Sequence, residues 1–259
     1  MVATALAVSK GFTDRVVDLL DRLDYRLIDT DDEKEQVFRL RYDAYLREGA
    51  IKPNFTKKLY DHFDDAENSW TFGVHIDGKI VSSMRVCVSS PAQPMTPAVD
   101  AFGEVLESEL KRGTTIIDCN RFVTDAEAAR IFPGLAYLTV RPGFLACPFF
   151  KAEIVTATVR KEHQAFYKRV FGFTQVCEPR PYPTVTKPLS LMTVNYHSVR
   201  EMILGRPYYR STFFERRMLF ERAPRMPRPA AEMLQAKLPA ANINAAESED
   251  KDRRVKVSP

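Results

Sequence analysis

Paired cysteines and long apolar runs are missing from this sequence. Its four cysteines are scattered, and none belongs to a Cys-x-x-Cys pair, so the common zinc-binding spacings are absent. No stretch approaches the roughly 20 apolar residues of a transmembrane helix. The short apolar N-terminus lacks the basic residues that open a signal peptide. We therefore expect a cytoplasmic protein with reduced thiols, no bound metal and no transmembrane segment.

A strong charge of one sign is also missing. The net charge is only +4, and apolar residues make up 45% of the 259 residues. Nucleic-acid-binding proteins usually carry a concentrated basic face, so we expect no nucleic-acid partner. The composition instead predicts a globular chain with a sizeable core, whose mild positive charge is compatible with docking one acidic partner.

Hydrophobic spacing predicts an α/β chain. Residues 70–76 alternate between apolar and smaller or polar side chains, Asp77-Gly78 follows, and KIVSSMRVCV continues as a second strand, which predicts a β-hairpin. Helical spacing predicts helices at 11–23, 30–47, 57–63, 99–111, 135–146, 162–173, 198–204 and 208–221. Further strands are predicted at 25–29, 114–123, 152–159, 173–178 and 187–196. Pro142 is expected to kink or end its helix early.

Composition divides the chain into three parts. Residues 1–23 are predicted to be an N-terminal helical extension and residues 24–222 a single α/β domain. Residues 223–259, where proline, alanine and charged residues dominate, are predicted to be a mostly disordered tail. The order of the predicted elements favours a mixed sheet with helices on both faces.

Five short segments carry most of the candidate chemistry. They are LRYDAY at 40–45, YDHFDDAE at 60–67, SSMRVCV at 82–88, IIDCNRFV at 116–123 and EHQAFYKRVFGF at 162–173. Their order and spacing resemble those of the acyl-homoserine-lactone synthases and the long-chain N-acyl amino acid synthases, over about residues 25–200. Both groups belong to the GNAT superfamily. The resemblance implies a GNAT acyltransferase fold with a central mixed, largely antiparallel sheet, and an enzyme that moves an acyl group from acyl carrier protein to an α-amine.

The resemblance also implies where the amine substrate binds. Side chains on the first helix would lie beside it, acidic residues would line its pocket or hold an arginine, and the hairpin arginine would face the same cleft. Arginines suit the carboxylate of an amino acid because their planar fork binds it with two hydrogen bonds. The predicted substrate-binding residues are Arg41, Tyr45, Asp61, Asp64, Arg85 and Phe122.

Three residues are predicted to act in the chemical step. By resemblance, Asp118 and Arg121 form the acidic and basic pair of the central strand, and Tyr167 gives a proton to the departing thiolate. The lactone synthases usually carry Glu at the acidic position, so the shorter Asp118 is a departure. On a regular strand, residues three apart point to opposite faces. If Asp118 and Arg121 serve one cleft, a β-bulge must lie between them, near Cys119–Asn120.

The acyl donor makes two further demands. A long acyl chain needs a dry tunnel, because each buried methylene contributes about 0.8 kcal/mol. The candidate tunnel residues are Phe122, Leu135, Leu138, Phe144, Phe149 and Phe150. An acidic carrier protein needs a basic docking surface, for which the candidates are Lys151, Arg160, Lys161, Lys168 and Arg169.

Two absences separate the alternative functions. The stretch LREGAIKPNF at 46–55 lacks the Trp that lactone synthases use to hold S-adenosylmethionine. The segment TDAEAARIFPG at 124–134 has one glycine and no Gly-x-Gly turn for the diphosphate of coenzyme A. The leading hypothesis is therefore transfer of a medium- or long-chain acyl group from acyl carrier protein to the α-amine of an amino acid, with no resident cofactor. The alternatives are an S-adenosylmethionine-dependent lactone synthase, a coenzyme A-dependent acetyltransferase and an inactive lipid-sensing module.

Each candidate residue also has a structural explanation. Asp61 and Asp64 could be solvated turn residues, and Asp118 with Arg121 could form an ion pair that holds the sheet. Tyr167 could be a core aromatic, and the basic residues of its helix could form a solvated face. The histidines singled out as structural or exposed are His75, His163 and His197.

Overall fold

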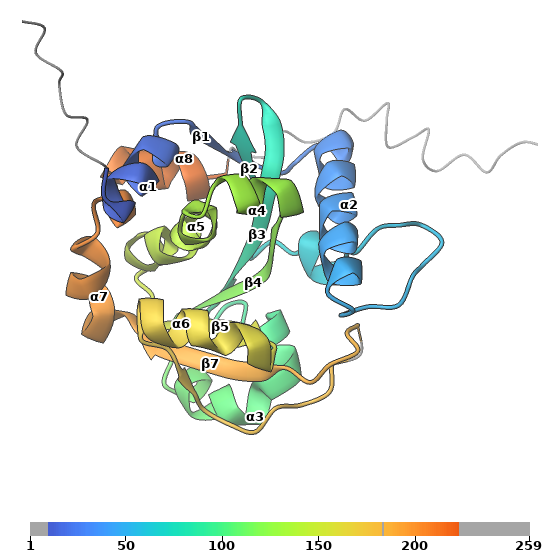
Figure 1. The fold of residues 1–259 in the computed structure, drawn as a ribbon. Coiled ribbons are helices and arrows are strands. Elements are labelled where there is room, and N and C mark those ends of the chain that lie inside the picture. The colour runs from blue at the N-terminus through green and yellow to red at the C-terminus, as the bar shows by residue number, and fades with distance from the viewer. Residues whose placement is uncertain (1–9, 183, 223–259) are drawn as a thin grey trace, which may run out of the picture. The chain divides into compact units, whose positions relative to one another are not determined.

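The computed structural model describes residues 10–182 and 184–222, which Figure 1 draws as coloured ribbon. The described fold belongs to the unit Met1–Glu221. The apolar residues 1–9 and the predicted disordered tail 223–259 lie outside the described residues. The predicted division of the chain into three parts therefore stays a prediction.

A seven-stranded sheet with the order β1-β2-β3-β4-β5-β7-β6 forms the centre of the fold. In the described part of the chain, β4 and β5 are parallel and every other neighbouring pair is antiparallel. This confirms the expected mixed, largely antiparallel sheet. The strands are β1 (Leu23–Leu27), β2 (Ser69–Ile76), β3 (Lys79–Ser89), β4 (Ile116–Thr124), β5 (Ile154–Val159), β6 (Thr174–Gln175) and β7 (Ser190–Asn195).

The hairpin of β2 and β3 forms where the sequence predicts it. Asp77 and Gly78 have φ values of 52° and 78°, which is the left-handed pair that a two-residue type I′ turn requires. Every residue of β2 is buried, because helices cover both faces of the sheet at this strand. The hairpin is therefore a central part of the core.

Helices cover both faces of the sheet, as expected (Figure 1). The helix α5 (Leu135–Phe150) contacts β3 and β4 on one face, and α1 (Phe12–Leu20) and α8 (Phe213–Phe220) pack against α5. The helix α2 (Asp31–Arg47) and the helix α3 (Pro97–Lys111) contact the other face. The remaining helices and 3₁₀ turns are η1 (His62–Asp64), α4 (Ala126–Ile131), η2 (Lys161–His163), α6 (Gln164–Phe171), α7 (Tyr196–Leu204) and η3 (Pro207–Tyr209).

Three local predictions are wrong. The helix α5 does not end near Pro142 but continues past Pro148 to Phe150. The two prolines lack the N–H groups of two helical hydrogen bonds, and the burial of the central turns against the sheet stabilises the helix by more than this loss. The predicted helix at 57–63 is absent, because Lys57 takes a left-handed conformation and only a 3₁₀ turn forms, at η1. The segment between β4 and α5, for which no helix was predicted, contains α4, which Asp125 caps.

None of the described helices has the length and apolar character that crossing a membrane requires.

The strands β4 and β5 separate part-way along their length. They pair from Ile116 with Ile154 to Cys119 with Ala157, and the pairing stops there although both strands continue. The helix α5 packs closely on β4 at this point, since a Cβ atom added at Gly143 would lie 2.4 Å from the sulfur of Cys119. The gap that opens beyond Cys119 is where the candidate site lies.

We expect Gly143→Ala to destabilise the fold by about 1–3 kcal/mol, because the added methyl overlaps the Cys119 sulfur. Adding Cys119→Ala should restore much of the loss. The matched control is Gly103→Ala, whose added Cβ has its nearest contact 4.0 Å away, at Val99. Urea denaturation measures all three. A Gly143→Ala variant as stable as wild type would show that the packing of α5 on β4 is looser than described.

Candidate active site

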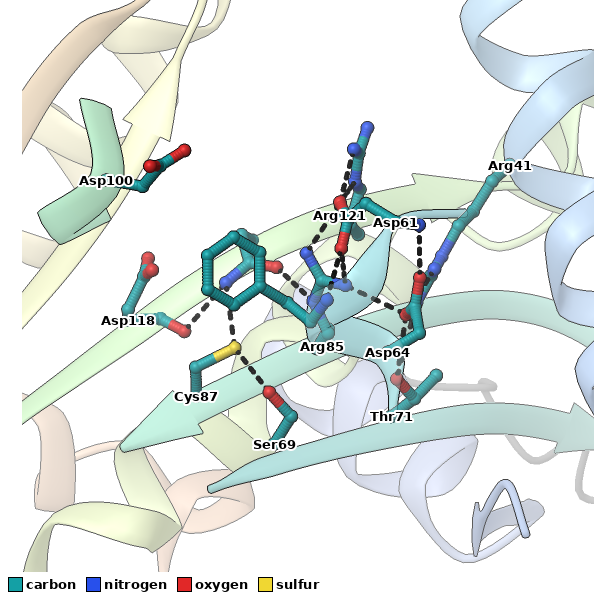
Figure 2. Close-up of polar contacts among 12 residues, drawn as sticks. Arg41, Asp61, Asp64, Ser69, Thr71, Arg85, Cys87, Asp100, Asp118 and Arg121 are labelled. Atoms are coloured by element: carbon teal, nitrogen blue, oxygen red, sulfur yellow. Dashed lines mark hydrogen bonds and ion pairs between the residues drawn. The ribbon is translucent and has the colours of Figure 1, made fainter. Parts of the chain in front are cut away.

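Three arginines and two aspartates form one buried ion-pair network across α2, η1, β3 and β4 (Figure 2). Arg41 donates to Asp64 at 2.7 Å, and Arg85 lies 2.9 Å from the same Asp64 oxygen. Arg85 also donates to Asp61 at 2.6 Å, and Arg121 donates to the second Asp61 oxygen at 2.6 Å. Two carboxylates thus join three guanidiniums, which leaves one positive charge in excess.

The two aspartates are fixed by their own backbone. Asp61 is the N-cap of η1 and accepts a hydrogen bond from the Phe63 N–H at 3.0 Å. Asp64 accepts one from the Asp61 N–H at 3.0 Å, which completes a capping box. Local hydrogen bonds within the DHFD segment therefore orient both carboxylates, in addition to their ion pairs with the arginines.

A β-bulge in β4 brings Arg121 to the network. Between the pairs Ser83 with Val123 and Arg85 with Asn120, β4 has one residue more than β3. Arg121 has a φ of 51°, a left-handed conformation that costs a non-glycine residue about 1–2 kcal/mol. The expected bulge therefore exists, one to two residues after the predicted position. It lets Arg121 reach Asp61 from the same face as Arg85.

The network holds both carboxylates ionised. Burial alone would raise the pKa of Asp64, but Arg41 and Arg85 outweigh it and lower that pKa below its ordinary value of 3.8. The pKa of Asp61 is also lowered, because Arg85 and Arg121 outweigh the effect of burial. Neither carboxylate is a strong base.

A cavity of about 320 Å³ lies beside the network, where β4 and β5 separate. Its walls come from the ends of β4 and β5, from α2 and α6, and from the loop before β7. The lining residues include Tyr45, Glu48, Asp61, Arg85, Cys119, Asn120, Arg121, Phe122, Thr158, Arg160, His163, Phe166, Tyr167, Tyr182, Thr184 and Val185. Arginine side chains and aromatic side chains therefore line the same space.

The predicted substrate-binding residues divide into two layers. Of the six, Tyr45, Asp61, Arg85 and Phe122 line the cavity. Arg41 and Asp64 lie behind that wall, buried within the network. Their contacts hold Arg85, so they support the site without lining it.

Asp118 lies apart from the arginines. It is fully buried, accepts a hydrogen bond from the Ala98 N–H at 2.8 Å and one from the Thr156 hydroxyl at 3.4 Å, and caps the start of α3. It does not line the cavity, and in Figure 2 no line joins its carboxylate to a guanidinium. The alternative of an Asp118–Arg121 ion pair is wrong, because Arg121 pairs with Asp61. Burial raises the pKa of Asp118.

Tyr167 borders the cavity from α6. Its ring packs against Phe166 and Phe173, and within the described residues its hydroxyl makes no hydrogen bond. Burial raises the pKa of Tyr167 well above its ordinary value, so the hydroxyl keeps its proton. A group that is protonated and has no partner in the protein can donate to a ligand.

The predicted acyl-tunnel residues do not line this cavity, apart from Phe122. The helix α5 turns them into the core instead. Phe149 and Phe150 pack around Phe220, and Phe144 packs against Phe171. Leu135 and Leu138 are likewise fully buried in the main core. The sequence could not distinguish core from tunnel, because both require the same apolar side chains.

The predicted docking residues are also not equivalent. Lys151, Lys161, Lys168 and Arg169 are exposed. Arg160 is buried, lines the cavity and pairs with Glu48 and Glu162, so it does not belong to an exposed docking surface.

Sequence reasoning missed one wall of the cavity. Tyr182, Thr184 and Val185 belong to the loop before β7, which has no periodic pattern. Thr186 ties this loop to the end of α2, with hydrogen bonds to the Ala50 carbonyl at 2.8 Å and the Gly49 carbonyl at 2.7 Å. The contact spans well over 100 residues of sequence, and no local signal indicates it.

His163, expected to be structural or exposed, has a half-exposed side chain that also lines the cavity beside Arg160 and Glu48. Burial and the nearby Arg160 charge lower the pKa of His163, so its imidazole is neutral at neutral pH. Within the described residues, no group of three or more His, Cys, Asp or Glu side chains could hold a metal ion.

The family model of FeeM, an N-acyl amino acid synthase, matches residues 36–195 of this chain. The chain belongs to the FeeM family. This confirms the resemblance drawn from the five segments and makes the protein an N-acyltransferase. A search of curated protein sequences finds no match to this chain.

Solved structures agree on the fold of this N-acyltransferase. The structure of FeeM, an N-acyl amino acid synthase from uncultured soil microbes, is similar with a TM-score of 0.57 and 18% identity, covering 72% of this chain and 98% of FeeM. The CoA-dependent acyl-homoserine lactone synthase BjaI gives a TM-score of 0.50 at 17% identity, over 72% of this chain and 90% of BjaI. The lactone synthase LasI gives a TM-score of 0.50 at 11% identity, over 66% of this chain and 89% of LasI. The GNAT fold is confirmed.

The network should make stability depend on pH in a defined way. Because the pKa of Asp64 is lowered by folding, its contribution is present above the ordinary carboxyl value of 3.8 and is lost as pH falls below it. We expect Asp64→Asn to lower the free energy of unfolding by about 3 kcal/mol at pH 7, since it leaves Arg41 and Arg85 underpaired. The difference from wild type should shrink below about pH 4.

Denaturant unfolding across this pH range measures the effect. The matched control is Asp65→Asn, whose carboxylate is exposed and pairs with Lys34, and which should cost under about 1 kcal/mol. Equal losses of unfolding free energy in Asp64→Asn and Asp65→Asn would show that Asp64 does not belong to a stabilising buried ion-pair network.

Proposed function

We propose that this N-acyltransferase moves a medium- or long-chain acyl group from acyl carrier protein to the α-amine of an amino acid. One observation supports this acceptor above all. The network of three guanidiniums and two carboxylates has an excess positive charge, and Arg85 and Arg121 present it at the cavity wall. A buried excess charge is costly unless an anion completes it. The carboxylate of an amino acid is such an anion, and it carries the amine to be acylated.

The unpaired end of β4 suits the thioester. Beyond Cys119 the edge of β4 that faces β5 is no longer paired, so its N–H groups can donate to the thioester carbonyl as the tetrahedral oxyanion forms. Tyr167 then gives its proton to the departing thiolate. Phe122 and Phe166 supply an apolar surface for the first part of the acyl chain.

The acceptor ammonium must lose a proton before it attacks. Asp61 is a poor acceptor, because the arginines lower its pKa. Asp118 is the stronger base, since burial raises its pKa, but its carboxylate does not border the cavity. The predicted role of Asp118 therefore requires an intervening water to carry the proton.

The segment between β4 and α5 favours a carrier protein over coenzyme A. The Asp125 carboxylate accepts hydrogen bonds from the Glu127 and Ala128 N–H groups at 3.1 and 2.9 Å. These N–H groups lie at the start of α4, where a helix would otherwise bind a phosphate. Because the Asp125 carboxylate already accepts their hydrogen bonds and is itself negative, it disfavours binding of a diphosphate at this position. A carrier protein presents only its pantetheine arm to the site. A coenzyme A thioester is the second candidate donor, because the similarly folded BjaI is CoA-dependent.

The acceptor is more consistent with an ordinary amino acid than with S-adenosylmethionine. Residues 46–55 contain no Trp, and Trp70 is buried against Phe150 and Phe220 in the core. The cavity therefore has no tryptophan to stack on a nucleoside.

Replacing Arg121 with Ala should lower kcat/KM by about 100-fold or more, because it removes the excess charge that receives the carboxylate. The fold should persist, since Asp61 keeps both hydrogen bonds from Arg85. The control is Arg39→Ala, an exposed arginine of α2. Steady-state kinetics of acyl transfer measure the activity of both variants, and circular dichroism checks that both are folded. Normal turnover by the Arg121 variant would show that Arg121 has no role in substrate binding or catalysis.

Reversing two exposed charges of α6 tests the donor. Lys168→Glu with Arg169→Glu should raise KM for acyl carrier protein by about tenfold, while small thioester donors react unchanged. The two residues make no ion pair with a described residue, so the fold should not change. The control is Lys79→Glu on the β2–β3 turn. Equal effects on both donors would refute docking at α6.

A further inference from the structure

The last described helix, α8, has two faces of different character. On its inner face, Leu219 and Phe220 are buried, and the Trp70 indole N–H donates to the Phe220 carbonyl at 3.1 Å. Thr212 caps its first turn, and Glu215 pairs with the buried Arg141. The helix is therefore held rigidly against the core.

The outer face of α8 is apolar and uncovered by described residues. It consists of Phe213, Phe214 and Met218, whose exposed fractions are 66%, 70% and 69%. No other described helix exposes three large apolar side chains. Because the inner face anchors α8, this exposure does not arise from fraying of a loose helix. A rigid face of this kind indicates an interaction surface.

Three arginines lie on α8 or just before it in the chain: Arg210, Arg216 and Arg217. Residues 196–221 contain five arginines and three glutamates, with no lysine or aspartate. The Glu215 carboxylate is neutralised by Arg141, and Arg217 lies over the Phe213 ring while pairing with Glu221. Arg210 is exposed and, within the described residues, its guanidinium bonds only to the Leu204 carbonyl. Among the described residues, Arg210 and Arg216 have no carboxylate partner, so the charge next to the face is positive.

We propose that the outer face of α8 binds the surface of an anionic lipid bilayer. Aromatic and Met side chains enter the boundary between headgroups and acyl chains, and arginines contact lipid phosphates. A second copy of the chain fits less well. Three exposed apolar side chains form a small patch beside the roughly 800 Å² per partner that a stable dimer buries. Binding at α8 places the enzyme beside the bilayer into which an acylated product partitions.

Vesicle co-sedimentation of the full chain tests the proposal. Wild type should bind vesicles of phosphatidylcholine and phosphatidylglycerol, bind phosphatidylcholine alone at least about fivefold more weakly, and dissociate at high salt. The variant Phe213→Ser/Phe214→Ser/Met218→Ser should bind about tenfold more weakly. The matched control Phe55→Ser/Met95→Ser/Ile131→Ser removes three other exposed apolar side chains and should bind like wild type.

Two results would overturn the proposal. One is wild type that fails to bind the anionic vesicles, or binds them no better than the α8 variant. The other is a wild-type dimer in solution that the α8 variant dissociates, which would assign the face to a second copy. Unchanged thermal unfolding of both variants establishes that any loss of binding is not a loss of fold.

Discussion

The double ion pair of Asp61 determines how the site is built. Its two oxygens join Arg85 of β3 to Arg121 of β4, and its backbone position is set by the cap of η1. Because Asp64 in turn holds Arg85 and Arg41, one short turn organises guanidiniums from three separate elements. The aspartates keep the arginines ordered and close together, yet they are one too few to neutralise them. The charge that remains is what makes the site able to bind an anion.

A second constraint comes from the irregular end of β4. The bulge at Arg121 and the loss of pairing with β5 after Cys119 occur within a few residues of each other. The first turns a guanidinium toward Asp61, and the second opens the cavity beside it. A regular strand would do neither, because it would stay paired with β5 and alternate its side chains strictly. The left-handed residue Arg121 therefore links the ion-pair network to the cavity.

Much of this could be predicted from local sequence. Asp77-Gly78 encodes its hairpin through backbone conformation, and the DHFD segment encodes a cap, so both depend on neighbours in the chain. The bulge could be expected but not positioned, since its register depends on contacts between strands. The path of α5 through Pro142 and Pro148 depends on tertiary burial. The cavity wall at Thr184 depends on a tether to the end of α2, and the placement of Phe149 in the core depends on α8. No local pattern carries such long-range information.

A crystal structure of the enzyme with an N-acyl amino acid bound tests the central claim most directly. The carboxylate should lie within hydrogen-bond distance of Arg121 or Arg85, the amide nitrogen should lie between this face and Tyr167, and the acyl chain should start in the gap between β4 and β5. A product whose carboxylate points to solvent, with the arginine network unchanged and no anion beside it, would contradict the account.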